Sequence, residues 1–262
     1  MTVTDDECRH GLANRECDAC FPKARPEAPV ATSTRASRSK AATLARSSAA
    51  EAASIDLAAQ RVYHLTHIDN LASIIAAQSI LSDAAGATPS LDISSPHARE
   101  ARRMITVDDE GHTVADYVPF FLSPTSAAWG SIRTGTADPR LNGTPNPTEF
   151  VLLVTSLGAV GAAKPETSEL VVSDRDATHP LARFATTRDA AERFFRSLNA
   201  DLDSSQLLEA ELLVAESVPL ELVSVITVAN DRSRNRVKEL LKGSGFSARV
   251  AIHPPWFSAE VI

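Results

Sequence analysis

The chain has 262 residues, of which 44% are hydrophobic and 23% charged, and its formal net charge at pH 7 is −7. This is the composition of a globular protein with one sizeable core and room for an appendage. The acidic balance excludes a protein that coats duplex DNA by bulk electrostatics, because such proteins need many unopposed lysines and arginines. Any contact with nucleic acid is therefore expected to be local.

The sequence carries no signal of membrane insertion or export. No run of about 18 apolar residues occurs, which is the length that a helix needs to cross a bilayer. The first residues, MTVTDDECRHG, are acidic and lack the charged and then apolar pattern of a signal peptide. We therefore expect no membrane contact and a cytoplasmic location.

The three cysteines of the chain all lie close to its start. Cys8 and His10 form a C-x-H motif, and Cys17 and Cys20 form a C-x-x-C motif, so two tight turns carry ligands that can surround zinc. The ligand set is closed, and the segment is too short for a core of its own. We therefore predict a structural zinc that folds residues 1–22 as a zinc knuckle. The alternative is a disordered tail with incidental cysteines.

The segment that follows differs in composition from both its neighbours. Residues 23–56 are rich in Ala, Ser, Thr, Pro and basic residues and poor in aromatic and β-branched residues, which predicts a flexible linker. An alternative interpretation is that the basic side chains of this segment lie on phosphate. From residue 57 onward the pattern is globular, so the predicted organisation is a zinc knuckle (1–22), a linker (23–56) and one catalytic domain (57–262).

The domain begins with a short apolar segment, 61–65, that predicts a strand. A helix is expected next, capped by Asp69 or Asn70, and residues 97–104 predict a basic helix or turn. The later elements predicted from apolar runs and helical spacing are strands at 117–123, 149–155, 209–215, 222–228 and 246–252 and helices at 188–202 and 233–241. Because strands and helices do not alternate regularly, we predict an α+β fold rather than a doubly wound parallel sheet.

Common catalytic fingerprints are absent: there is no G-x-G-x-x-G, G-x-x-x-x-G-K-[ST], H-E-x-x-H or G-x-S-x-G motif. What remains are polar clusters within apolar strands. In the first cluster His64 lies in strand-like sequence, and Thr66, His67 and Asn70 crowd the turn into the helix, where side chains can be aimed at a ligand. The alternative is that His64 is a satisfied core histidine and Asn70 only a helix cap.

Two further clusters follow along the chain. Arg102 and Arg103 form a basic pair that can bind a pyrophosphate. The alternative is that the pair lies on a solvent-exposed face. Glu209 and Glu211 are predicted to share one face of an alternating strand. A carboxylate at the start of an apolar strand can stabilise positive charge on a ligand. Equally, it can protect an edge strand from pairing with other chains and aggregating.

These clusters, in this order and at this separation, resemble the DarT family of nucleic-acid-modifying ADP-ribosyltransferase toxins. The first cluster matches the family's Y-H-x-T-H-x-x-N-L-x-x-I pattern through Tyr63, His64, Thr66, His67, Asn70, Leu71 and Ile74. Further matches are the arginine pair, the segment DYVPFF with the nearby Ser-Pro, AELLV with the SVP that follows it, and the terminal PWF. The matches span about residues 63–257. The N-terminal C-x-H-G and C-x-x-C element resembles one attached to some relatives.

The resemblance implies an ADP-ribosyltransferase-like fold, with a mixed or antiparallel sheet core and flanking helices, and NAD as the donor of ADP-ribose. By resemblance, the residues that hold or orient NAD are His64, Thr66, Asn70 and Arg102, and the catalytic residues are Glu211 and Arg102. Arg103 remains an alternative to Arg102 for this role. The implied reaction modifies a base in single-stranded DNA, and the implied setting is a toxin–antitoxin or phage-defence system with a macrodomain-type antitoxin.

Two departures from the family pattern concern the target. Thr125 follows the Ser-Pro pair, where family members usually have arginine, and residues 199–209 contain no Trp, Lys or Arg, although this loop is usually aromatic and basic. Single-stranded bases are commonly held by aromatic stacking next to basic residues. Two alternatives therefore stay open: ADP-ribosylation of RNA or protein by the same site, and a non-catalytic zinc-knuckle adaptor for nucleic acid.

Overall fold

The computed structural model describes residues 56–94, 96–134, 145–166, 168–200 and 205–258 of the chain. The predicted zinc knuckle, with Cys8, His10, Cys17 and Cys20, lies outside the described residues, as does the predicted linker apart from its last residue. Within the described ranges, no helix has the length and apolar character needed to cross a membrane. From Leu57 onward, the described residues belong to one compact unit.

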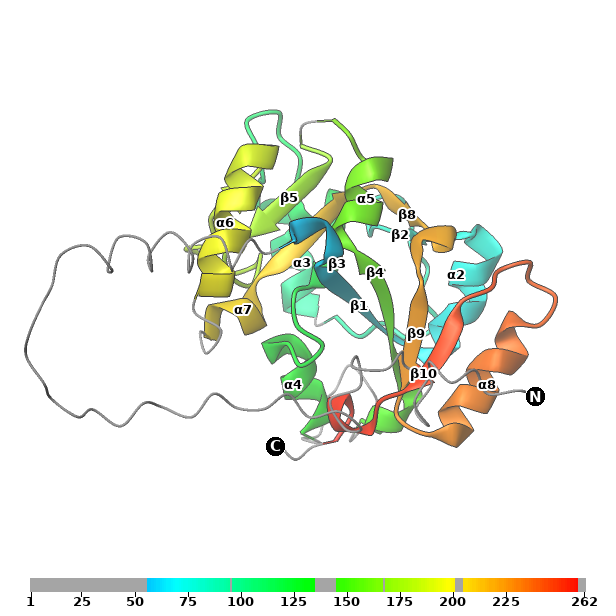
Figure 1. Ribbon diagram of the computed structural model, residues 1–262. Coiled ribbons are helices and arrows are strands. Elements are labelled where there is room, and N and C mark those ends of the chain that lie inside the picture. Colours follow the sequence, from blue (N-terminus) through cyan, green and yellow to red (C-terminus); the bar gives the residue numbers. More distant parts are fainter. Residues whose placement is uncertain (1–55, 95, 135–144, 167, 201–204, 259–262) are drawn as a thin grey trace, which may run out of the picture. The chain divides into compact units, whose positions relative to one another are not determined.

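An eight-stranded sheet forms the centre of the part of the chain that the structure describes (Figure 1). The strand order across the sheet is β10-β9-β4-β1-β3-β7-β5-β6. Neighbouring strands are antiparallel, except that β9 and β10 are parallel. The strands are β1 (Arg61–His67), β3 (Tyr117–Phe121), β4 (Phe150–Ser156), β5 (Leu170–Ser173), β6 (Phe184–Ala185), β7 (Glu211–Ala215), β9 (Val225–Val228) and β10 (Arg249–Ile252). A separate antiparallel ribbon joins β2 (Ser79–Leu81) and β8 (Ser217–Pro219).

Helices cover both faces of this sheet. In the view of Figure 1, α3 (Pro96–Met104) lies behind the sheet, whereas α5 (Leu157–Ala163) and α6 (Arg188–Ala200) lie in front of it. α8 (Asp231–Leu241) packs beside β10. The other helices are α2 (Leu71–Ala77), α4 (Ala127–Arg133) and α7 (Ser205–Glu209). Side chains of one strand therefore alternate between two helical layers.

The central strands are buried on both faces, which explains their continuous apolar sequences. In β4 every residue except the last is buried, and β7 is buried from its first residue to Val214. Leu212 and Val214 belong to the large core cluster. Leu213 instead packs in a second cluster with Tyr117 and Val171. Neighbouring residues of β7 thus lie on opposite faces of the sheet.

The predicted α+β class, with a mostly antiparallel sheet and flanking helices, is confirmed. Three predicted strands are shorter than expected, and a fourth, β7, begins at Glu211 instead of residue 209. β3 ends at Phe121, β9 begins at Val225 because a 3-10 turn occupies Leu220–Leu222, and β10 begins at Arg249. The short strands β2, β5 and β8 were not predicted, because three or four residues carry too little alternation to be recognised.

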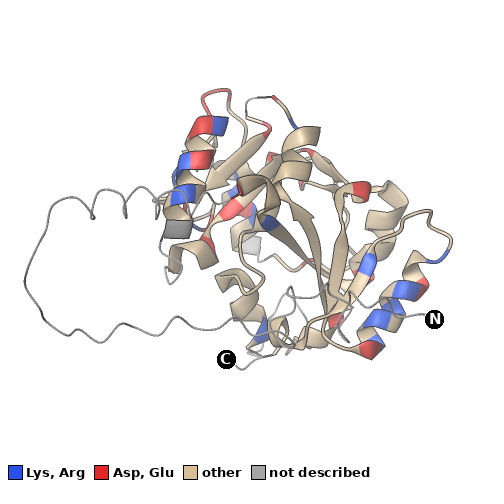
Figure 2. Ribbon diagram, viewed as in Figure 1, with Lys and Arg blue, Asp and Glu red and all other residues tan. Residues whose placement is uncertain are grey.

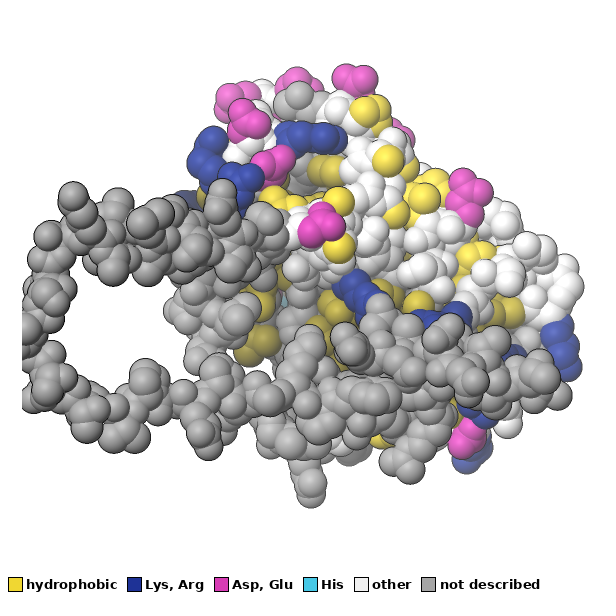
Figure 3. Space-filling model, viewed as in Figure 1, with side chains coloured by type: hydrophobic (Ala, Val, Ile, Leu, Met, Phe, Trp, Pro, Cys, Tyr) yellow, Lys and Arg dark blue, Asp and Glu magenta, His cyan; other side chains and the backbone are white. Residues whose placement is uncertain are grey.

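Side chains of both charge signs are interspersed on the surface helices (Figure 2). On α6, Arg196 pairs with Glu192 at 3.0 Å, and directly after α8, Lys242 pairs with Glu239 of the helix at 2.7 Å. Such exposed pairs contribute little stability. They do balance positive and negative charge on the surface of each helix. The described atoms of the face in Figure 3 accordingly show basic and acidic side chains next to one another and no broad basic surface.

Candidate active site

A cavity of about 510 Å³ lies on the face of the sheet that α3 covers. Small-molecule sites usually have volumes of roughly 300 to 1,000 Å³, so this cavity is of suitable size. Residues of β1, β3, β7, α2 and α3 line it, together with the segment 82–94. The structure brings to this cavity the predicted site residues His64, Thr66, Asn70, Arg102 and Glu211.

The carboxylate of Glu211, the first residue of β7, is almost completely buried, with 2% of the residue exposed. Arg102, from α3, donates from Nη2 to Oε2 at 2.5 Å. The main-chain N–H of Ala177 donates to Oε1 at 3.1 Å. Each carboxylate oxygen thus has a donor from a different element. Because charges act more strongly away from water, this buried carboxylate is well placed to oppose positive charge on a bound ligand.

The two arginines of the predicted pair have different partners. Arg103 has 58% of its side chain exposed and donates two hydrogen bonds to Asp83, at 3.0 and 2.8 Å. Arg103 does not line the cavity. The structure therefore brings Arg102, and not Arg103, to Glu211.

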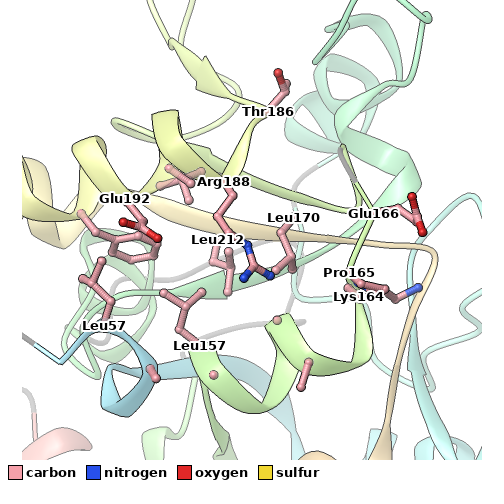
Figure 4. A pocket seen from close by; sticks show the side chains of 17 residues that line it. Leu57, Leu157, Lys164, Pro165, Glu166, Leu170, Thr186, Arg188, Glu192 and Leu212 are labelled. Carbon is pink, nitrogen blue, oxygen red and sulfur yellow. The ribbon is translucent and has the colours of Figure 1, made fainter.

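The prediction that Glu209 and Glu211 share a strand face is wrong. Glu209 is the exposed last residue of α7, because residues 205–209 (SQLLE) form a helical turn and β7 begins only at Glu211, opposite Ser173. The next residue, Leu212, lines a second cavity of about 410 Å³ instead (Figure 4). That cavity is mostly apolar, and none of the predicted site residues lines it.

His64, in the middle of β1, has a hydrogen bond that determines its tautomer. Its Nδ1 lies 2.9 Å from the carbonyl oxygen of Pro119, and because a carbonyl can only accept, Nδ1 carries the proton. Burial lowers the pKa of His64, the hydrogen bond to Pro119 acts in the opposite direction, and the charge of Arg102 adds to the lowering. The ring is therefore neutral at neutral pH, which leaves Nε2 as an acceptor. His64 is both a hydrogen-bonded histidine of the sheet and part of the cavity wall.

Asn70 is the N-cap residue of α2, one of the two predicted positions, but its side chain makes no capping hydrogen bond. Its Nδ2 donates to the Leu91 carbonyl at 2.8 Å and to the Thr66 hydroxyl at 3.1 Å. Its Oδ1 accepts the Leu91 N–H at 2.9 Å. A buried amide with these bonds holds the segment 82–94 against the turn between β1 and α2. A ligand that contacts Asn70 or Thr66 directly must replace one of these bonds or add to them.

Sequence reasoning missed the residues that approach Glu211 from β5. Ser173 accepts the N–H of Glu211 at 3.2 Å, and the following loop supplies Ala177. Both Ser173 and Asp174 are buried. The signal that could have found them is a polar pair placed directly after the apolar strand LVV, since polar residues at strand ends often belong to sites.

Comparison with protein families gives one match over most of this unit. A family model described as "DarT: ssDNA thymidine ADP-ribosyltransferase, DarT" matches residues 63–258. The chain is 29% identical over 205 residues to a protein of Thermus sp. (strain 2.9) called DNA ADP-ribosyl transferase, which covers 75% of this chain and 95% of the relative. A protein of the same name from Mycobacterium tuberculosis (strain ATCC 25618 / H37Rv) is 28% identical over 207 residues, covering 74% of this chain and 86% of its own.

Solved structures with the same fold include two complexes of one bacterial protein. The Thermus sp. 2.9 DarT in complex with ADP-ribosylated ssDNA matches with a TM-score of 0.65 and 27% identity, over 76% of this chain and 96% of that one. The same protein in complex with NAD+ matches with a TM-score of 0.61 and 26% identity, over 76% and 98% of the two chains.

Proposed function

Because the chain belongs to the DarT family of ssDNA thymidine ADP-ribosyltransferases, we propose that it cleaves NAD in the cavity around Glu211 and attaches the ADP-ribose to a base there. The family assignment places it among glycosyltransferases of the pentosyltransferase type, with NAD as substrate and single-stranded DNA as acceptor. The observation that carries the assignment of residues is the Arg102–Glu211 ion pair, which lies in one cavity with His64, Thr66 and Asn70.

The proposed reaction breaks the bond between nicotinamide and the ribose carbon. The electron pair leaves with nicotinamide, and positive charge develops on the ribose carbon as in an oxocarbenium ion. The buried carboxylate of Glu211 opposes this charge and accepts a hydrogen bond from a ribose hydroxyl. A nitrogen of the acceptor base then bonds to the ribose carbon, and its proton passes to Glu211 as general base.

The guanidinium of Arg102 is suited to two tasks at once. Among the described residues, Arg102 donates a side-chain hydrogen bond from Nη2 to Glu211. An arginine has five N–H donors in a rigid fork, so the other donors stay available for the pyrophosphate of NAD. Arg102 thereby orients the cofactor relative to the carboxylate. His64 contributes Nε2 as an acceptor for a ribose hydroxyl, because its Nδ1–H is bonded to Pro119.

The acceptor is tested by mass spectrometry of oligonucleotides incubated with the protein and NAD. We expect a mass increase of one ADP-ribose on single-stranded DNA and not on RNA of the same sequence. Modification of RNA alone would favour the RNA alternative. Radiolabelled NAD with a cell lysate reports protein acceptors in parallel. A purified protein that never consumes NAD would favour the non-catalytic adaptor.

Asn70→Ala should raise the KM for NAD by roughly tenfold, which corresponds to about 1.4 kcal/mol of binding free energy. The reason is that the segment 82–94 loses its hydrogen bonds to Asn70, so the cavity wall is no longer preorganised for NAD. The matched control is Asn230→Ala, which removes the hydrogen bond from Ser233 N–H at the start of α8, away from the cavity. Steady-state kinetics on both variants make the comparison. Equal KM values for the two variants would contradict the proposed role of Asn70.

We also propose that the enzyme acts as the toxin of a toxin–antitoxin or phage-defence system, with a macrodomain-type antitoxin as partner. The support is the family membership, since members of this family modify DNA. Expression in a bacterial host should stop growth, and coexpression of a macrodomain hydrolase that removes ADP-ribose from DNA should restore it. Normal growth with an active enzyme would contradict the toxin role.

The proposed zinc knuckle is supported by its donor set, since three thiolates and an imidazole are typical of structural zinc. Cys17→Ser and Cys20→Ser should each remove one zinc per chain and leave NAD cleavage largely unchanged, because the ligands Cys8, His10, Cys17 and Cys20 are remote in sequence from Glu211. Elemental analysis of the full chain measures the metal. A wild-type protein without zinc would contradict the knuckle.

A further inference from the structure

The last residue of β5 and the connection from β5 to β6 each contact Glu211. Ala177 N–H donates to the Oε1 of Glu211 at 3.1 Å, and Ser173 Oγ accepts the N–H of Glu211 at 3.2 Å. The hydroxyl of Ser173 also donates to the carbonyl of Arg175 at 2.6 Å. The main chain of Glu211 is therefore bonded to the end of β5, and its side chain depends on where the connection lies.

A single buried carboxylate joins the two ends of the connection. Asp174 Oδ1 accepts the main-chain N–H of Arg183 at 2.9 Å, and Oδ2 accepts its Nε at 2.8 Å. The Nε of Arg175 donates to Oδ1 at 3.3 Å, and the Asp174 N–H donates to the Arg183 carbonyl at 3.2 Å. Asp174 has 4% of its surface exposed. The segment 174–183 is thus closed into a loop, and Ala177 lies inside it.

Asp174 is ionised in this position. Burial raises the pKa of Asp174, but hydrogen bonds from the main chain and side chain of Arg183 and from Arg175 outweigh it, so the pKa lies below its usual range. All the groups that face the carboxylate are donors. An amide in place of the carboxylate would turn an NH₂ group toward at least one of these donors, which breaks the closure without changing the size of the side chain.

From this geometry we infer that Asp174 is a positioning residue for Glu211: it closes the loop 174–183 and thereby holds the Ala177 N–H at the carboxylate. Asp174 does not line the cavity, so it acts without touching NAD. The inference rests on the proposed function, in which Glu211 opposes the charge on the ribose. A displacement of about 1 Å in a reacting group can reduce a rate by up to a hundredfold. We therefore expect the loss of Asp174 to lower kcat.

Asp174→Asn should lower kcat by about tenfold or more while the KM for NAD changes less, because the proposed NAD ligands His64, Asn70 and Arg102 lie outside the loop 174–183, although two other residues of that loop line the cavity. The matched control is Asp108→Asn. Asp108 also closes a loop, by accepting the N–H groups of Glu110 and His112 and a bond from the His112 ring, but it lies outside the cavity. Kinetics and thermal unfolding of both variants separate a local effect on the site from a loss of fold.

A double-mutant cycle with Glu211→Gln distinguishes this inference from the proposed function. If Asp174 acts through Glu211, the second substitution should add little to the loss caused by Glu211→Gln. Independent, multiplying losses would overturn the positioning role while leaving the role of Glu211 intact. Full activity of Glu211→Gln alone would instead overturn the proposed function.

A milder variant covers the case in which Asp174→Asn does not fold. Arg183→Gln removes the exposed donor to Asp174 Oδ2 but keeps the main-chain bond at Oδ1. It should lower kcat less than Asp174→Asn and leave the KM for NAD unchanged. A folded Arg183→Gln variant with wild-type kcat would contradict the inferred closure.

Discussion

Replacing Glu211 by Gln should lower the rate of ADP-ribose transfer by about a hundredfold or more, roughly 3 kcal/mol, as expected when one electrostatic stabiliser is removed. The substitution keeps the shape of the side chain and an acceptor for the Ala177 N–H, but it removes the charge that opposes the oxocarbenium ion. The loss should therefore appear in kcat more than in the KM for NAD. Steady-state kinetics with a single-stranded DNA oligonucleotide measure both constants.

Glu209→Gln is the matched control, because Glu209 is the same type of residue two positions earlier but lies exposed at the end of α7. It should keep nearly the wild-type rate. In cells, expression of the Glu211→Gln variant should be tolerated where the wild-type enzyme stops growth. A Glu211→Gln enzyme that modifies DNA at the wild-type rate would remove Glu211 from the mechanism.

Arg102→Ala should lower kcat/KM by about tenfold to a hundredfold, the effect of losing hydrogen bonds between charged groups. The variant leaves the buried Glu211 carboxylate without its cation and NAD without a proposed pyrophosphate ligand. Arg102→Lys should recover little of the activity. A single ammonium group cannot reproduce the planar fork that reaches a carboxylate and a phosphate together.

The neighbouring Arg103 provides the control for this prediction. Arg103→Ala removes an exposed pair with Asp83 at the surface of α3, and exposed pairs contribute little. We expect a far smaller change in kcat/KM than for Arg102→Ala, measured under the same salt conditions. An equal loss from Arg103→Ala would mean that the second arginine, and not Arg102, serves the reaction.

Much of the fold could be predicted because the central elements are long and consistent. The run EFVLLVT became β4, and the spacing of Ala191, Phe194, Phe195 and Leu198 became α6. The boundaries around Glu209 were wrong because local helix formation in SQLLE competes with extension of the strand, and pairing with β5 begins only at Glu211. Short strands such as β2 depend on a distant partner, β8, that local sequence does not reveal.

The sequence by itself predicted which residues compose the candidate site, since the polar residues His64, Thr66, Asn70, Arg102 and Glu211 interrupt apolar elements and match one family pattern. Only the tertiary structure decided which partners these side chains have. It joins Arg102 to Glu211 across 109 positions of the chain and pairs Arg103 with Asp83. It also bonds the Asn70 side chain to Leu91 and not to the first turn of α2. The physical reason is that spacing along a chain specifies which face of an element a side chain takes, whereas its partner depends on the packing of elements far apart in sequence.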